Sequence, residues 1–149
     1  MSTMLFPIGR IRRTDTGFQG HLSRDLEHEA DAVWAMLTES ASMAQWLAPG
    51  SIQQQPGGAV RIDFADSGTV IDSTVTAFEP GRVLEYSWSS GEQPQRPLRW
   101  ELHPRGGGTR LELFVDIPAG EDVAKACAGF EGHLEMLATV LEGVSTRFP

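Results

Sequence analysis

The sequence predicts an α+β fold in which a curved antiparallel sheet wraps around a long C-terminal helix, with two short helices after the first strands. Three observations lead to this fold class. A Trp-rich helical segment lies near the start, strands with a period of two and tight turns follow it, and the chain ends in a helix with one apolar side. A bent sheet and a long helix can enclose a pocket, so we look for function there first.

Composition limits the class of protein. A length of 149 residues indicates one domain, 1–149, with a core over about 9–143. The formal net charge of -8 argues against nucleic acid and against anionic membranes as partners, since both require a cationic surface. The single cysteine, Cys127, excludes an internal disulfide and fits a reducing cytoplasm, the location we expect. We expect no signal peptide at Met1–Ile8 and no membrane span.

The first elements are two strands and two short helices. Residues 9–28 predict two strands, because the Gly-containing turn at 15–17 separates them. Over 30–38 the spacing of the apolar residues changes to that of a helix face. Ser40 can cap a second short helix, which Pro49 and Gly50 end.

Five further strands follow, and each alternates apolar and polar residues. They cover 60–64, 69–78, 84–88, 98–103 and 111–115. Together with the first two strands they predict a sheet of about six to seven strands. Short turns between them indicate an antiparallel meander. Since successive strands reverse direction, the segments 65–68, 89–97 and 117–121 should meet at one end and form the rim of any pocket. The turns at 79–81 and 104–108 should lie at the other end.

The last helix carries an apolar stripe with gaps of four and three residues. Its members are Val123, Cys127, Phe130, Leu134, Leu137 and Leu141. Gly129 and Gly132 are unusual there, since each costs about 1 kcal/mol of helix stability relative to alanine. They could allow close packing of the helix, or could soften it where a ligand enters.

Several segments together resemble a known superfamily. The runs VWAMLTE at 33–39, QWLAP at 45–49 and PGG at 56–58 resemble the SRPBCC superfamily, as do 70–88 and the final helix over 129–142. More narrowly, they resemble the branch related to the activator of heat-shock-protein-90 ATPase. The resemblance implies the helix-grip fold, also called START-like or Bet v 1-like, and a pocket, but no particular reaction. This sequence departs from the family pattern at Glu29, where proline is frequent, and at Phe130, where tryptophan is usual.

The expected pocket lies between the inner face of the sheet and the last helix. Its candidate residues are Tyr86, Trp88, Leu98, Trp100, Leu113, Phe130 and Leu134. We expect Trp34 and Trp46 to be core residues, whereas Trp88 and Trp100 could pack in the core or line the cavity.

The sequence assigns no catalytic residue, no cofactor and no metal. His21, His28, His103 and His133 lack the spacing of metal ligands, and only His133 flanks the apolar stripe. Asp72 and His133 are the two candidates for acid–base chemistry. Asp72 would be buried if its face of strand 69–78 lines the cavity, and solvated if Ile71 and Val75 face inward.

Three functions remain open at this stage. The leading hypothesis is a non-catalytic binder of a small apolar or amphipathic molecule. A cyclase or dehydratase using the same cavity is the first alternative, based on what the superfamily resemblance implies. The second is a chaperone-partner module, although the chain lacks the extra domain of the eukaryotic activators. An edge strand at 9–15 could also pair with a second copy of the chain.

Overall fold

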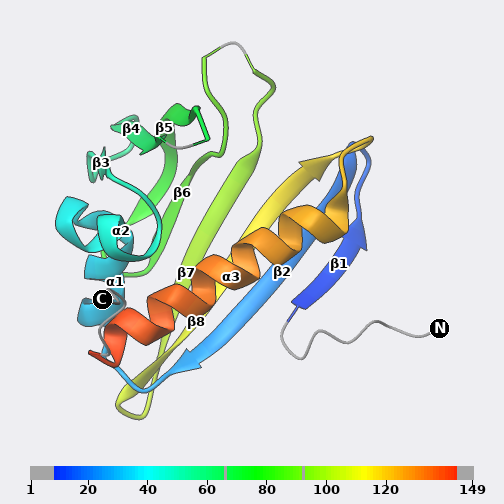
Figure 1. Ribbon diagram of the computed structural model, residues 1–149. Helices are drawn as coiled ribbons and strands as arrows, with labels where there is room; N and C mark the ends of the chain where they lie inside the picture. The colour runs from blue at the N-terminus through cyan, green and yellow to red at the C-terminus, as the bar shows by residue number, and fades with distance from the viewer. Residues whose placement is uncertain (1–8, 66, 92, 144–149) are drawn as a thin grey trace.

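An antiparallel sheet curves around helix α3 in the computed structural model, which describes residues 9–65, 67–91 and 93–143 (Figure 1). This architecture confirms the α+β helix-grip class. The elements are β1 Gly9–Arg13, β2 Gly17–Leu26, α1 Ala30–Thr38, α2 Ser40–Trp46, β3 Gly50–Ile52, β4 Ala59–Phe64, β5 Thr69–Glu79, β6 Val83–Ser87, β7 Pro97–Arg105, β8 Gly108–Pro118 and α3 Val123–Leu141. The expectation about Met1–Ile8 lies outside the described residues.

Eight strands of the described chain form one sheet in the order β1-β2-β8-β7-β6-β5-β4-β3. The meander from β4 to β8 is confirmed. Strand β2 pairs with β8 along its whole length, from Gly17 opposite Pro118 to Leu26 opposite Thr109. The expected count of six to seven strands was too low because β3 has only three residues, too few to show a period.

The ends of the helices differ in how they are capped. Ser40 is the first residue of α2 and not its cap, so that expectation was wrong; the N-cap is Glu39, which makes no side-chain capping hydrogen bond. At the start of α3, the Asp122 carboxylate accepts a hydrogen bond from the Lys125 backbone N–H at 3.0 Å. This bond satisfies one of the free N–H groups of the first turn of α3.

Helix α3 lies across the concave face of the sheet with its apolar stripe inward (Figure 1). The buried members of the stripe are Cys127, Phe130, Leu134 and Leu137. Gly20 on β2 permits this close approach, because a Cβ atom there would lie 2.9 Å from the Cys127 Sγ. Arg24, also on β2, makes ion pairs with Glu131 at 2.7 Å and Glu135 at 2.8 Å. Strand β2 therefore fixes α3 by both packing and charge.

The deep part of the space between α3 and the sheet is filled by side chains. Tyr86, Leu98, Trp100, Leu113 and Leu134 are each at most 2% exposed. The Trp100 ring meets the Trp46 ring edge-on, with centroids 5.9 Å apart. The Trp46 indole N–H donates to the Met36 carbonyl at 2.6 Å. Trp46 is thus a core residue, as expected, whereas Trp34 is half-buried and donates to the Gln54 side chain.

Two of the predicted rim segments meet at one end of the fold. Arg96, in the loop between β6 and β7, forms an ion pair with Glu121, which precedes α3. The Phe64 ring, just before the rim segment 65–68, lies 5.9 Å from the Trp88 ring. Residues 66 and 92, which belong to the first and second rim segments, are not among those described. No helix in the described ranges is long and apolar enough to cross a membrane.

Candidate functional site

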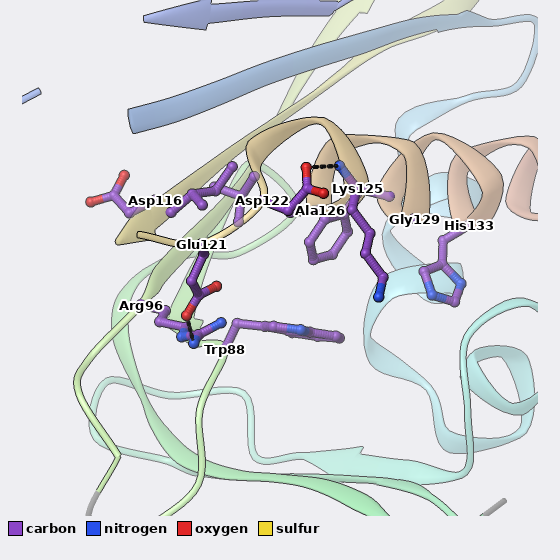
Figure 2. Close-up of a pocket in the computed structure, with 12 residues that line it drawn as sticks. Trp88, Arg96, Asp116, Glu121, Asp122, Lys125, Ala126, Gly129 and His133 are labelled. Carbon is purple, nitrogen blue, oxygen red and sulfur yellow. Dashed lines mark hydrogen bonds and ion pairs between the residues drawn. The ribbon is translucent and has the colours of Figure 1, made fainter. Parts of the chain in front are cut away.

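A pocket of about 500 Å³ opens between α3, the end of β8 and the chain that follows β6 (Figure 2). This volume falls within the range of small-molecule sites. The pocket lies at the end of the fold where Arg96 and Glu121 meet, and both residues line it. The rim was therefore predicted in the right place for 89–97 and 117–121.

The wall of the pocket is aromatic and aliphatic. The Trp88 and Phe130 rings pack edge to face with centroids 5.3 Å apart. Val115 and Ile117 from β8 and Ala126 from α3 complete the apolar surface. Trp88 is half-buried, so part of its indole remains available to a bound molecule. Such a surface binds mainly by removing apolar groups from water.

The mouth of the pocket carries charges of both signs. Arg96 and Glu121 pair across it, and Asp122 and Lys125 also line it. Figure 2 shows the Lys125 side chain extending away from the α3 axis, on the same side as Trp88 and His133. An amphipathic molecule could place an anionic group near the Lys125 ammonium while its apolar part contacts the rings.

His133 is the titratable side chain most enclosed by the wall. Its imidazole lies among the rings of Trp46, Phe64 and Phe130, with centroids 6.1–6.4 Å away. Burial lowers the pKa of His133 below its usual value, and a hydrogen bond with the Trp46 backbone acts in the opposite direction. The ring is therefore mainly neutral at neutral pH, and can donate or accept one hydrogen bond without carrying charge.

Most of the predicted pocket residues lie elsewhere. Trp88 and Phe130 line the pocket, and so does His133. The other five, Tyr86, Leu98, Trp100, Leu113 and Leu134, face inward as expected but belong to the packed core. Their assignment to the pocket needs correction, because α3 approaches the sheet too closely to leave space beneath it. Burial raises the pKa of Tyr86 to about 12, with a hydrogen bond from Trp100 acting the other way, so its hydroxyl stays protonated.

Asp72 does not reach the pocket. It lies on the outer face of β5, where its side chain is 60% exposed and pairs with Arg61 at 3.6 Å. Ile71 and Val75, on the inner face of the same strand, are buried. The sequence did not determine which face of this strand points inward. In the structure it is the face with Ile71 and Val75, and Asp72 is solvated.

Sequence reasoning found His133 but missed the rest of the polar part of the site. Arg96 and Glu121 fell within predicted rim segments but were not singled out. Lys125, Gly129 and His133 are spaced by four residues, which places them on one side of α3 beside the apolar stripe. That spacing was the available signal, and the stronger apolar stripe next to it obscured it.

The fold and the pocket define a class, the helix-grip α+β domains with a pocket beside the C-terminal helix. The chain belongs to the family of Activator of Hsp90 ATPase homolog 1-like proteins, whose model matches residues 27–142. This match confirms the resemblance drawn from the sequence. No curated protein matches the chain.

Solved structures share the fold over most of the chain. Protein MLL2253 from Mesorhizobium loti is 24% identical with a TM-score of 0.74, over 85% of this chain and 98% of that one. CalU16 from Micromonospora echinospora is 20% identical with a TM-score of 0.75, over 89% and 84%. DynU16, from the dynemicin biosynthetic locus, is 30% identical with a TM-score of 0.76, over 86% of this chain but only 49% of its own. The first two similarities concern the fold alone.

Proposed function

We propose that the chain binds a small apolar or amphipathic molecule in the pocket beside α3. The observation that carries the proposal is the pairing of an aromatic wall, Trp88 and Phe130, with a charged mouth in a space of about 500 Å³. Because the deep space is filled, the ligand contacts the first half of α3 and the loop after β6. The origin of DynU16 in a biosynthetic locus is compatible with a small organic ligand.

The chemistry of the mouth selects the ligand class. Burying apolar surface contributes about 25 cal/mol per Å² before ordering costs, which gives affinity but little direction. His133 and Lys125 supply polar contacts at the edge of the apolar wall. We expect a ligand with an aromatic or aliphatic body and one polar or anionic end.

Two glycines on α3 provide a matched test. A Cβ atom at Gly129 or Gly132 would meet nothing within 4 Å, so both positions accept a side chain. Gly129 lines the pocket, whereas Gly132 does not. We expect Gly129→Leu to weaken binding of the amphipathic dye anilinonaphthalene sulfonate at least about tenfold, or 1.4 kcal/mol. Gly132→Leu should bind as the parent does while gaining the same helix propensity.

The dye titration is followed by fluorescence on folded protein, with circular dichroism as the check of folding. Equal dye affinity in both variants and the parent would show that the pocket is not the binding site. Mass spectrometry of molecules that co-purify with the parent, and are lost from Gly129→Leu, would then identify the natural ligand.

An enzyme of the cyclase or dehydratase kind is the second candidate, and His133 is the observation that favours it. A neutral imidazole in an apolar wall can act as a general base near neutral pH. The test compares the bound molecule before and after incubation with the parent and with His133→Gln. A binder returns the molecule with unchanged mass, whereas an enzyme returns it with water lost or a ring closed only when His133 is present.

The remaining expectations about partners stay predictions. Strand β1 lies at the edge of the sheet and exposes Ile11, which supports pairing with a second copy of the chain. Size-exclusion chromatography of Ile11→Lys against the parent tests this pairing, and an unchanged dimer fraction would refute it. A chaperone partner, nucleic acid and membranes remain unexpected, and the cytoplasm remains the expected location.

A further inference from the structure

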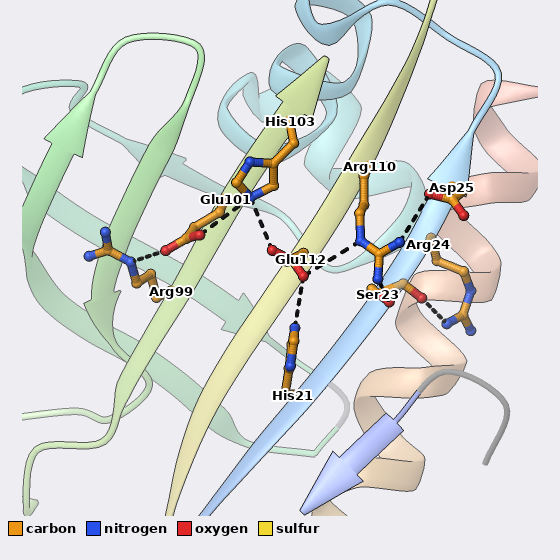
Figure 3. Close-up of polar contacts among 9 residues, drawn as sticks. All are labelled: His21, Ser23, Arg24, Asp25, Arg99, Glu101, His103, Arg110 and Glu112. Atoms are coloured by element: carbon orange, nitrogen blue, oxygen red, sulfur yellow. Dashed lines mark hydrogen bonds and ion pairs between the residues drawn. The ribbon is translucent and has the colours of Figure 1, made fainter. Parts of the chain in front are cut away.

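Histidine and glutamate side chains gather on the outer face of the sheet, on the side away from α3 (Figure 3). Glu101 on β7 and Glu112 on β8 lie directly opposite each other in the strand register. His103 follows on the same face of β7, and His21 approaches from β2. Two carboxylates in directly opposed positions repel each other, so this part of the sheet requires nearby positive charge.

One nitrogen atom in this cluster is buried and has no hydrogen-bond partner. The His103 Nε2 lies 3.0 Å from the Glu112 Oε1 and 3.4 Å from the Glu101 Oε1. Neither contact has hydrogen-bond geometry, and the atom is buried without a partner among the described residues. The three atoms lie within 4.8 Å of one another. A buried imidazole nitrogen beside two carboxylate oxygens is satisfied either by a proton shared with them or by a cation bound between them.

The other oxygen of each carboxylate already has a partner. The Arg99 Nε donates to the Glu101 Oε2 at 2.6 Å. The His21 imidazole bonds the Glu112 Oε2 at 3.0 Å and stacks on Phe114, with ring centroids 4.3 Å apart. These contacts fix both carboxylates and leave each Oε1 directed at His103 (Figure 3).

We propose that Glu101, His103 and Glu112 bind a divalent transition-metal ion of the Zn²⁺ type, with water at the fourth position. Tetrahedral coordination with bonds of about 2.1 Å separates the ligand atoms by about 3.4 Å. The His103 Nε2 lies 3.0 and 3.4 Å from the two carboxylate oxygens, and all three atoms lie within 4.8 Å of one another. Mixed imidazole and carboxylate donors favour Zn²⁺ over Mg²⁺ and Ca²⁺, which prefer six or more oxygen ligands. His21 acts as a positioning residue, because it orients Glu112 without binding the ion.

The spacing of the sequence could not reveal this site. Two ligands stand two residues apart on β7, and the third comes from β8, so no helical spacing or short motif contains them. The strand register brings them together. The sequence-based expectation of no metal rested on linear spacing alone, and it is tested by the experiment below.

The test is isothermal titration calorimetry of the 149-residue chain with ZnCl₂ at neutral pH, and the same titration with MgCl₂ serves for comparison. We expect one Zn²⁺ site that Mg²⁺ does not fill. His103→Asn and Glu112→Gln should each lower the association constant at least about tenfold. His28→Asn is the matched control, since His28 and Glu142 form a separate His–Glu pair at 3.0 Å, and it should leave the affinity unchanged.

A spectroscopic measurement distinguishes a metal site from a simple ion pair between His103 and the two carboxylates. In the NMR spectrum of the imidazole nitrogens, Zn²⁺ should shift the Nε2 resonance of His103 and leave that of His28 in place. Circular dichroism confirms that each variant is folded. The proposal is overturned if no Zn²⁺ binds, if His103→Asn and Glu112→Gln bind it like the parent, or if the His103 resonance does not move because His103 is an imidazolium paired with the two carboxylates.

Discussion

Replacing Gly20 with alanine tests how closely α3 approaches the sheet. The added methyl carbon would lie 2.9 Å from the Cys127 Sγ and 3.3 Å from the Val115 Cγ1. The first distance is shorter than carbon–sulfur contact allows, so the Cys127 side chain, the helix or the strand must shift. Both neighbours belong to the buried core, where little room exists for such a shift.

The expected cost follows from two opposing effects. Adding a methyl group to a packed core costs about 1–3 kcal/mol. Alanine in a strand interior is about 0.5–1 kcal/mol more favourable than glycine. The free energy of unfolding should therefore fall by about 1–2 kcal/mol. For a chain of this length, that loss lowers Tm by about 3–6 °C.

A double-mutant cycle identifies the contact responsible. Cys127→Ala removes the Sγ, so Gly20→Ala should cost almost nothing in that background, which gives a coupling energy of about 1–2 kcal/mol. Urea denaturation of the four proteins supplies the energies. Gly132→Ala is the control, since a Cβ there meets open space and should stabilise α3 by up to about 1 kcal/mol. Equal costs of Gly20→Ala in both backgrounds would refute the close approach.

Three further predictions concern single side chains. Tyr86 is the only tyrosine, and its pKa is raised from 10.0 to about 12, so the ultraviolet absorbance of tyrosinate should show a midpoint near pH 12. The contribution of the protonated Tyr86 to folding stability is complete below pH 10 and is lost between pH 10 and 12. A midpoint near 10 would contradict burial of the ring. The Cys127 thiol should react with a disulfide reagent only after unfolding, since burial, with a smaller effect from Glu131, raises its pKa; fast reaction of the native chain would argue against this. Arg24→Ala should lower stability in urea by about 1–3 kcal/mol, whereas Arg61→Ala, which breaks an exposed pair, should cost less than about 1 kcal/mol; equal losses would show that Arg24 does not hold α3.

The fold could be predicted because its signals are local. Alternating residues in β4 to β8 and the stripe of α3 each reveal the buried face of one element. For strand 69–78 the alternation left two faces open, and the structure places Ile71 inward and Asp72 outward. Strand β3 was missed because pairing with β4, rather than its own three residues, makes it a strand.

The pocket could be predicted only in part, because its depth depends on how far α3 stands from the sheet. The alternation of residues along the strand indicated that Tyr86 and Trp88 share the inner face. It did not indicate that Tyr86 is buried in the core while Trp88 reaches the pocket. The glycines show the same limit. Gly129 and Gly132 were candidates for close packing, yet both face open space, and the glycine that α3 requires is Gly20 on the strand. Which side chains reach the pocket, and which glycine permits close packing, depends on distances between elements that the sequence alone does not show.

The pairing of β2 with β8 has a consequence for how the chain acquires its structure. Gln19 and Asp116, neighbours across these strands, are 97 residues apart in sequence. β1 can pair with β2 early, but a ribosome must synthesise most of the protein before β2 can also pair with β8. The β8 side of β2 stays unpaired until then. Contacts between such distant segments slow folding and expose intermediates to aggregation. Nascent chains truncated before β8 should be the species that depend most on chaperones.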